Sequence, residues 1–279
     1  MTSAAIEEQI RAYYSALYDA WGAQHWWPAR TRFEVIVGAY LTQNTSWKNV
    51  EIALRRLRAT GSWNLRAIRK MPLEQLEAMI RPAGYFRQKA ARLKTFVAFV
   101  DQYYGGSLRR LFAQPTPKLR QELLSLNGVG PETADSILLY AGQHPVFVVD
   151  AYTRRIAERH GIAAASTKYE ELRELFERAL ESPAQAPAKL RTKKQTLDLI
   201  SHSPSAMSRA LRSPLAQVYN DMHGLIVAIG KHYCLKNQLR CERCPLQKFL
   251  PGAGSLVSAL TPVMASNQAS RPFRRHIRL

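Results

Sequence analysis

An acidic residue placed directly after a short apolar run is the leading candidate for a catalytic group in this sequence. Residues 146–149 read Val-Phe-Val-Val, and Asp150 follows them. Four consecutive apolar residues favour a buried segment, so the carboxylate at its end is not expected to be simply solvated. A fixed carboxylate can stabilise a developing positive charge and can orient or deprotonate a water molecule. We therefore take Asp150 as the candidate catalytic residue.

A glycine-rich turn lies upstream of this acid. Residues 127–131 read Asn-Gly-Val-Gly-Pro, and Pro131 suits the first turn of a helix that begins at about Glu132. The two glycines permit positive φ angles and close backbone approach. Backbone N–H groups beside the positive end of a helix suit a phosphate oxygen, although a short Gly-Val-Gly turn is also compatible with an ordinary helical connection. The predicted DNA contacts in this turn are Asn127, Gly128, Val129 and Gly130.

The charge of the chain points to an anionic partner. The 279 residues include 40 Lys and Arg against 21 Asp and Glu, which gives a net charge of +19. An excess of this size favours a nucleic acid, but charge alone does not separate DNA from RNA or from an anionic membrane surface. No apolar run is long enough for a membrane span and no signal-peptide core is present, so we expect a cytoplasmic protein.

Tryptophans gather near the N-terminus, where Trp26, Trp27 and Pro28 follow one another and Trp47 comes after the polar segment 42–46. One interpretation is that Trp26 and Trp27 fill the seam between two helical domains. The other is that they wall a pocket for a base, since a base gains about 1–3 kcal/mol on an aromatic face.

The segment LNGVGPETADSILLYA followed by VVDAYTRR resembles the helix-hairpin-helix and aspartate signature of the endonuclease III superfamily of DNA glycosylases. The segments WWP, LTQNT and RPAGYFRQKAARL are similar to the 3-methyladenine DNA glycosylase III branch of that superfamily. This resemblance implies an all-α fold with two helical domains, a helix-hairpin-helix motif and an active site in the cleft between the domains.

The resemblance also implies roles for single residues. It places Trp26, Trp27 and Trp47 around a base that has left the helical stack. Glu132 either lines this pocket or is an exposed acid favoured by the dipole at the start of its helix. Gln43 corresponds to the residue that fills the hole left in the duplex, and Tyr85 to a wedge in the opposite strand. Arg87, Lys89, Arg92 and Lys94 form a cationic, outward face on the helix that follows Tyr85.

The expected domain boundaries follow from the same pattern. Residues 29–145 are predicted to form a six-helix barrel that contains the hairpin. Residues 1–28 and 146–250 are predicted to form the second domain, which includes a basic insertion at 183–214 and a cysteine loop at 234–250. Residues 251–279 form a basic tail expected to add unspecific DNA affinity.

Three cysteines, Cys234, Cys241 and Cys244, are the candidate metal ligands. Their spacing resembles the first three ligands of the iron–sulfur loop of the superfamily, but the fourth expected position holds Leu250. A [4Fe–4S] cluster normally takes four thiolates. Three alternatives stay open: a cluster with a different fourth ligand, a zinc site completed by His223 or His232, and a loop that binds nothing.

The expected function is that of a monomeric, monofunctional glycosylase acting on damaged double-stranded DNA. Members that also cut the strand use a lysine at the second position after the final glycine of the hairpin, and this chain has Glu132 there. The branch resemblance and the aromatic residues favour alkylated purines such as 3-methyladenine, whose positive charge suits an aromatic face. The alternatives are a glycosylase for oxidised or deaminated bases and a damage-binding protein without catalysis.

Overall fold

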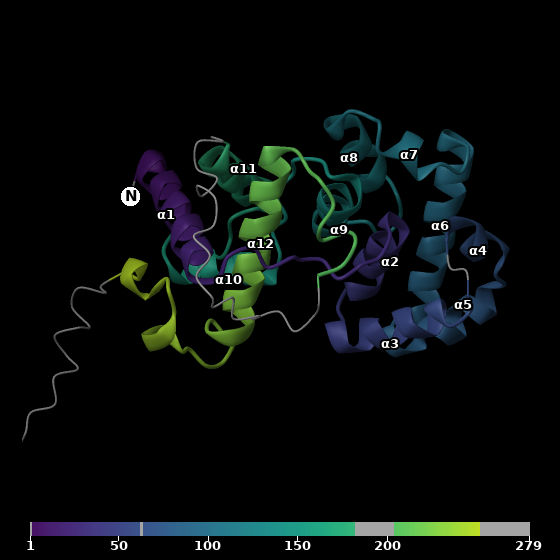
Figure 1. The fold of residues 1–279 in the computed structure, drawn as a ribbon, viewed down its shortest axis with the longest axis horizontal. Helices are drawn as coiled ribbons and strands as arrows, with labels where there is room; N and C mark the ends of the chain where they lie inside the picture. Colours follow the sequence, from purple (N-terminus) through teal and green to yellow (C-terminus); the bar gives the residue numbers. More distant parts are fainter. Residues whose placement is uncertain (1, 62–63, 182–203, 252–279) are drawn as a thin grey trace, which may run out of the picture.

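The computed structural model describes residues 2–61, 64–181 and 204–251, and this part of the chain is helical. The described residues contain no β-strand, only one isolated bridge between Cys234 and Leu239. Figure 1 shows the helices in two lobes that lie side by side. The prediction of an all-α fold with two helical domains is confirmed.

The first lobe is built from consecutive helices of the N-terminal half. They are α2 (Arg32–Thr42), α3 (Trp47–Arg58), α4 (Leu65–Lys70), α5 (Leu73–Ile80), η1 (Arg81–Ala83), α6 (Phe86–Tyr104), α7 (Leu108–Leu111), α8 (Thr116–Leu124) and α9 (Pro131–Ser136). The described part thus holds eight α-helices here, more than the six expected, because short helices such as α4 and α7 lie between the longer ones.

Local signals set many of the helix ends in this lobe. The Thr31 hydroxyl accepts from the Glu34 N–H at the start of α2, and Gly105 ends α6 in the left-handed region with φ 58°. After α9 the chain continues as a π-helical turn, η2 (Ile137–Gly142), which packs against α2 in its own lobe and against α12 in the other.

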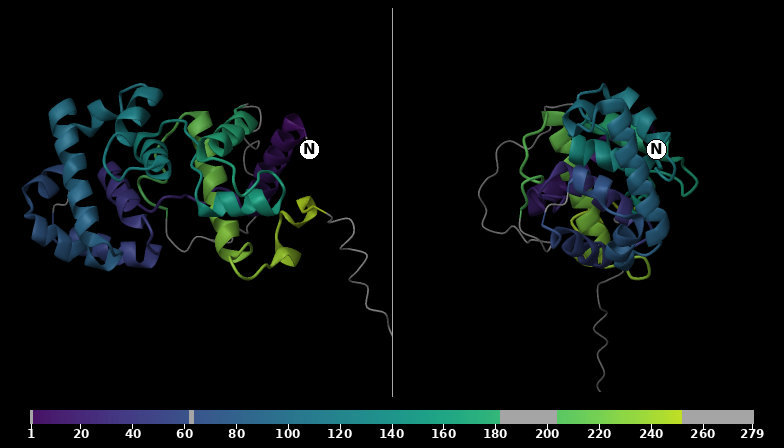
Figure 2. Two further views of the ribbon diagram at one scale, coloured as in Figure 1. Left: turned by 180° about the vertical axis from the view of Figure 1, so that it is seen from behind. Right: turned by 90° about the vertical axis from the view of Figure 1, so that its right-hand side faces the viewer.

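The second lobe combines the two ends of the described chain. It contains α1 (Ser3–Trp21), α10 (Ala151–Arg159), α11 (Tyr169–Leu180) and α12 (Pro214–His232), followed by the short turns η4 (Cys241–Arg243) and η5 (Gln247–Phe249). Helix α1 packs against α11 and α12, and α10 packs against α12. The view from behind also keeps this lobe apart from the first (Figure 2, left). The exact boundaries predicted at residues 29, 145 and 250 stay predictions.

Helix α12 is the central helix of the second lobe. All residues from Val218 to Gly230 are buried, including the polar residues Asn220, Asp221 and His223. Buried polar groups need hydrogen-bond or ionic partners, so these residues of α12 indicate that polar interactions form inside the core of this lobe.

Two lysines of α6 differ from expectation. Lys89 was expected on the outward cationic face, but it is only 1% exposed, and Lys94 is half-buried. Each ammonium group donates to backbone carbonyl oxygens of neighbouring helix ends, which replaces the water it loses. Charge periodicity alone therefore gave the wrong environment for Lys89.

Parts of two predicted segments lie outside the described residues, namely 183–203 of the basic insertion and 252–279 of the tail. Within the described part of the chain, no helix is both long and apolar enough to span a membrane.

Candidate active site

Asp150 caps the N-terminus of α10. Its Oδ1 atom accepts from the Thr153 backbone N–H at 2.8 Å and from the Thr153 hydroxyl at 3.0 Å. Burial acts to raise the pKa of Asp150, but His223 and the two Thr153 hydrogen bonds outweigh it and hold that pKa below its ordinary value. The carboxylate is therefore ionised at neutral pH and fixed in direction.

Side chains of α11 support the apolar segment before Asp150. The Phe147 N–H donates to Glu177 Oε1 at 2.9 Å, and the Val149 N–H donates to the Tyr169 hydroxyl at 3.3 Å. Tyr169 in turn donates to Asp135 of α9 at 2.9 Å. These side chains satisfy the N–H groups of Phe147 and Val149 and thereby fix where Asp150 stands.

His223 of α12 is the second buried polar group next to Asp150. Its Nε2 atom lies 3.5 Å from Asp150 Oδ2, and its Nδ1 atom is hydrogen-bonded to the Tyr140 hydroxyl. Burial raises the pKa of Tyr140 well above its ordinary value, so Tyr140 is a neutral phenol that donates to Nδ1. The Tyr140 hydroxyl therefore occupies Nδ1, and Nε2 is the ring nitrogen of His223 that faces Asp150.

The three predicted tryptophans lie together. Ring centroids are 6.0 Å apart for Trp26 and Trp27, 5.5 Å for Trp27 and Trp47, and 6.4 Å for Trp26 and Trp47. Trp27 also contacts Tyr140 at 5.1 Å, which joins the cluster to His223 and Asp150. The three rings thus form one cluster of tilted and edge-to-face contacts. Trp26 and Trp27 are buried, whereas Trp47 is half-buried.

Two glycines let the tryptophans sit at the seam between the lobes. A Cβ atom at Gly38 of α2 would lie 3.2 Å from the Trp27 ring, and one at Gly224 of α12 would lie 3.0 Å from Trp26 Cβ. Trp27 therefore packs closely on α2 and Trp26 on α12.

Lys231 is a site residue that the sequence interpretation missed. Its ammonium group lies 5.0 Å from the centroid of the Trp26 ring, over that ring. Burial lowers the pKa of Lys231, while Asp150 and Glu51 act to raise it. His223 and Lys231 are eight positions apart on one buried helix, and glycines at 224 and 230 beside them signal close approach of other elements.

Glu132 stands at the start of α9, and its charge is coupled to that of Asp150. Its side chain is exposed at the edge of the site, yet enough protein surrounds the carboxyl that burial, together with the charge of Asp150, raises the pKa of Glu132 to about 7. His223 and Arg154 act in the opposite direction.

The hairpin has the expected turn but differs in detail. Gly128 has φ +79°, whereas Gly130 has an ordinary negative φ as the N-cap of α9, with Pro131 in its first turn. Asn127 and Gly130 are exposed, but Val129 is 6% exposed and its N–H donates to the Leu126 carbonyl. The Val129 side chain consequently anchors the turn in the core.

Gln43 is attached to this hairpin. Its Nε2 donates to the Gly128 carbonyl at 2.9 Å and to the Thr133 hydroxyl at 3.0 Å, and its Oε1 accepts from Arg92 at 3.0 Å. Tyr85 precedes α6 with φ 47° and is 66% exposed, an unusual exposure for a large aromatic side chain. The structure thus places Gln43 and the hairpin together and leaves Tyr85 projecting.

The three cysteines line one small pocket together with Leu250 and His160. Leu250, at the position where the fourth thiolate is expected, contributes only hydrocarbon. His223 lies at Asp150 and is not available here, and burial lowers the pKa of His160 to about 4, with its Nδ1 hydrogen-bonded to Tyr13. Among the described residues, no three His, Cys, Asp or Glu side chains are arranged to hold a metal ion. The donor set does not fit a four-thiolate cluster.

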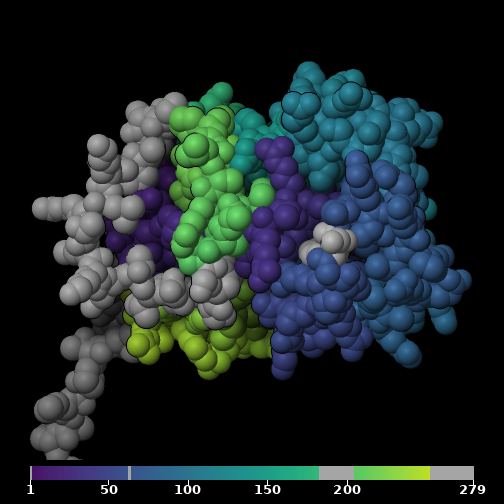
Figure 3. Space-filling view, turned by 45° about the vertical axis from the view of Figure 1, so that its right-hand side comes forward, coloured from purple at the N-terminus to yellow at the C-terminus, as the bar shows by residue number. Residues whose placement is uncertain are grey.

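Two cavities lie outside the polar cluster around Asp150. One, of about 460 Å³, is lined by Trp47 with residues of α3 and of the segments 28–30 and 204–206. Both segments lie near the junction of the lobes in the space-filling view (Figure 3). The other, of about 420 Å³, contains none of the predicted site residues and is lined by Tyr103, Tyr104, Gly105, Arg110, Ala113, Gln114, Lys118 and Glu122.

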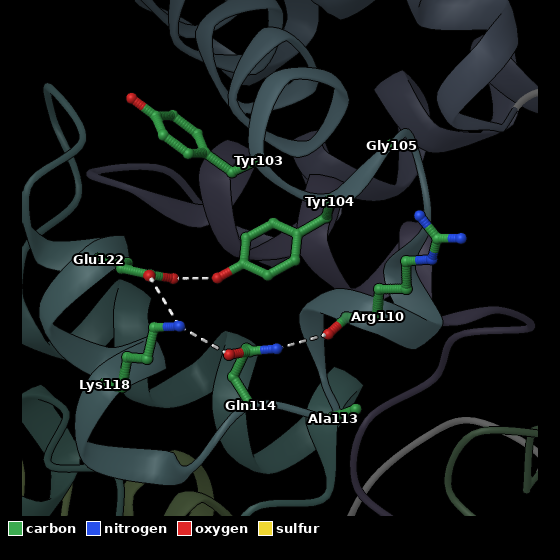
Figure 4. Close-up of a pocket in the computed structure, with 8 residues that line it drawn as sticks. All are labelled: Tyr103, Tyr104, Gly105, Arg110, Ala113, Gln114, Lys118 and Glu122. Atoms are coloured by element: carbon green, nitrogen blue, oxygen red, sulfur yellow. Dashed lines mark hydrogen bonds and ion pairs between the residues drawn. The ribbon is translucent and has the colours of Figure 1, made fainter.

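In that second cavity several polar side chains pair with one another. Figure 4 shows Glu122 between Tyr104 and Lys118, and Lys118 in turn reaching Gln114.

Comparison with known proteins identifies the family. The model of the HhH-GPD superfamily base excision DNA repair proteins matches residues 37–182. The provisionally named DNA repair glycosylase MJ1434 of Methanocaldococcus jannaschii is 41% identical over 243 residues, which cover 87% of this chain and 96% of that protein. The chain therefore belongs to the HhH-GPD superfamily of base excision DNA repair proteins.

Solved structures agree with this membership. The crystal structure of H. pylori 3-methyladenine DNA glycosylase (MagIII) bound to 1,N6-ethenoadenine has 28% sequence identity and a TM-score of 0.63, covering 83% of this chain and 98% of MagIII. A trapped covalent endonuclease III–DNA intermediate also has a TM-score of 0.63, but at 19% identity it shows a shared fold only. Membership of this superfamily supports DNA glycosylase activity.

Proposed function

We propose that this protein is a monofunctional DNA glycosylase that releases alkylated purines, such as 3-methyladenine, from double-stranded DNA. The observation that carries the proposal is Asp150, an ionised and doubly anchored carboxylate next to His223, whose partner Tyr140 packs against the tryptophan cluster. A protein that only binds damage has no need for such a group.

The proposed reaction is hydrolysis of the bond between base and deoxyribose. Its transition state has a positively charged, oxocarbenium-like sugar, which the Asp150 carboxylate stabilises while it directs or deprotonates the attacking water. An alkylated purine is already cationic, so it leaves as a neutral base without a strong general acid.

The lesion must first leave the base stack. Tyr85 is exposed and positioned to act as a wedge, and Gln43 lies beside the hairpin where it can fill the vacated space. The exposed backbone of Gly130, where an added Cβ would meet no protein atom within 4 Å, suits close approach of a phosphate. The surplus of cations supplies the unspecific part of DNA binding.

Stacking on Trp47 provides the proposed selection for a cationic base. The Lys231 ammonium group already covers Trp26, so a second cation on that ring would be repelled. Trp47 is half-buried, which leaves part of its surface for a base. Aromatic faces attract positive charge by about 0.5–2 kcal/mol.

A second part of the proposal is that the enzyme does not cut the DNA strand. Glu132 stands where a Schiff-base lysine would be required, and a carboxylate cannot form a Schiff base. Lys231 is an amine near Asp150, and its pKa is lowered. It is therefore the amine whose ability to form a Schiff base must be tested by borohydride trapping. Borohydride should trap no enzyme–DNA adduct, and Lys231→Met should leave that negative result unchanged.

For the cysteine loop we propose that no complete [4Fe–4S] cluster is bound, because the fourth position supplies Leu250. Arg159 takes part in holding the loop, donating to Cys234 Sγ at 3.1 Å and to the Leu235 carbonyl at 2.7 Å. Action as a monomer stays a prediction.

The decisive experiment is a panel of single-turnover assays on duplexes that carry methylated purines, 1,N6-ethenoadenine, 8-oxoguanine, uracil or thymine glycol. Release of methylated purines, with strand breaks only after hot alkali, supports the proposal. Preferred release of an oxidised or deaminated base would replace the substrate class, and tight binding without any release would make the protein a damage-binding protein.

A further inference from the structure

Lys89 of α6 joins two loops that are distant in sequence. Its Nζ atom donates to the Leu41 carbonyl and to the Ala83 carbonyl, each at 2.9 Å. Leu41 lies in the last turn of α2, two residues before Gln43, and Ala83 ends η1, two residues before Tyr85. A single buried cation therefore holds the bases of both loops, and hydrogen bonds from a charged donor are stronger than those between neutral groups.

A second bond joins the same loops. The Thr45 hydroxyl also donates to the Ala83 carbonyl, at 2.6 Å. Both loops contain a non-glycine residue in the left-handed region, Asn44 with φ 51° and Tyr85 with φ 47°. Such conformations are unfavourable for residues with a Cβ atom, and they persist where contacts such as these hydrogen bonds hold the backbone in place.

Arg92, one turn further along α6, connects the first loop to the hairpin. It donates to Gln43 Oε1, and its side chain lies so close to Gly128 that any Cβ atom there would collide with it. The side chains of Lys89 and Arg92 consequently hold three segments in one arrangement: residues 41–45, residues 83–85 and the hairpin.

We propose that Lys89 is a positioning residue for base extrusion, which fixes Gln43 and Tyr85 relative to each other so that both enter the duplex together. The inference rests on the proposed function, in which these two residues replace the lesion and separate the strands. If only one of these two side chains entered the duplex, some unstacked bases would have no replacement contact. A fixed distance between Gln43 and Tyr85 therefore lowers the free-energy cost of extrusion.

The test compares Lys89→Met with Lys94→Met. Lys94 is the matched control because it lies on the same helix and also donates to backbone carbonyls, at Ile68, Arg69 and Met71, away from both loops. Extrusion is followed in stopped flow by the fluorescence of 2-aminopurine next to an ethenoadenine, in an Asp150→Asn background that removes the chemistry.

Lys89→Met should slow extrusion by about 10–100-fold, the effect expected when reacting groups are misplaced by about 1 Å. Affinity for undamaged duplex should change less than about twofold, because backbone contacts supply it. Lys94→Met should extrude the base at the parental rate. Extrusion by Lys89→Met at the Lys94→Met rate would overturn the inference.

Two further outcomes are distinguishable. If Lys89→Met does not fold, Thr45→Val removes the second bond to Ala83 and should slow extrusion in the same direction; an unchanged rate then overturns the inference. If the protein with Lys89 intact neither extrudes nor releases any lesion in the panel, the proposed function fails instead.

Discussion

The two oxygens of Asp150 are held by different parts of the chain: Oδ1 by Thr153 within α10, and Oδ2 by His223 of α12 at 3.5 Å. The first contact is local and would form in any helix that begins with aspartate. The second depends on the packing of α12 against α10, and it turns a helix cap into a candidate catalytic group.

Replacing His223 should move the acidic limb of the activity profile. His223 lowers the pKa of Asp150, so in His223→Leu that pKa should rise, and base release should be lost at a higher pH as the medium is acidified. The measurement is the single-turnover rate against pH. His160→Gln, a change at another buried histidine, is the control, and equal profiles for all three proteins would contradict the role of His223.

Two substitutions of Asp150 should separate catalysis from capping. Asp150→Asn keeps an oxygen for the Thr153 N–H, whereas Asp150→Ala loses the cap at a cost of about 1 kcal/mol. Both should lower base release by at least about 100-fold, by analogy with removal of a transition-state contact. Urea denaturation should show the loss of stability in Asp150→Ala alone. Substantial activity in Asp150→Asn would remove Asp150 from the mechanism.

Trp47→Ala should lower release of 3-methyladenine by roughly 10–100-fold, because about 1–3 kcal/mol of stacking is lost. Binding to undamaged duplex should hardly change, since the hairpin and basic side chains provide it. Tyr103→Ala, at an exposed aromatic residue outside the site, is the control. A parallel fall in release and in undamaged-duplex affinity would show that Trp47 is a packing residue.

Glu132 should introduce a pH dependence near neutrality. Its pKa is raised to about 7, so raising the pH through 7 adds a negative charge at the site and should increase release of a cationic base. The folded state holds this proton more tightly than the unfolded chain. The contribution of Glu132 to the free energy of unfolding should therefore fall as the pH rises from about 4.5 to 7. Glu132→Gln should remove the pH dependence of base release near pH 7 and that of the free energy of unfolding. If the rate of this variant still changes near pH 7, another group is responsible.

Leu250→Cys should restore the four-thiolate set. After reconstitution with iron and sulfide, this variant should be brown and hold about four irons per chain, whereas the parent protein should not. Leu246→Cys adds a thiol to the same pocket at another position and serves as the control. Four irons in the parent protein would show that a non-cysteine ligand completes the cluster.

The sequence by itself determined the features that depend on neighbouring residues. Asn-Gly-Val-Gly-Pro specified the hairpin turn, because Gly128 takes a positive φ and Pro131 fits the first helical turn. The apolar run before Asp150 is buried, and Asp150 caps the next helix. Such signals act within one turn of a helix and can be read without the rest of the molecule.

Only the tertiary structure decided which distant residues meet. His223, mentioned in the sequence interpretation as a zinc ligand, lies at Asp150, and Lys231 covers Trp26. In the sequence, the spacing of Lys89 is that of a lysine on an exposed helix face. In the structure, the ends of α2 and η1 accept its hydrogen bonds and bury it. The environment of a side chain depends on which helices pack against its own, and these helices can lie far away in the sequence, as α12 does from Trp26.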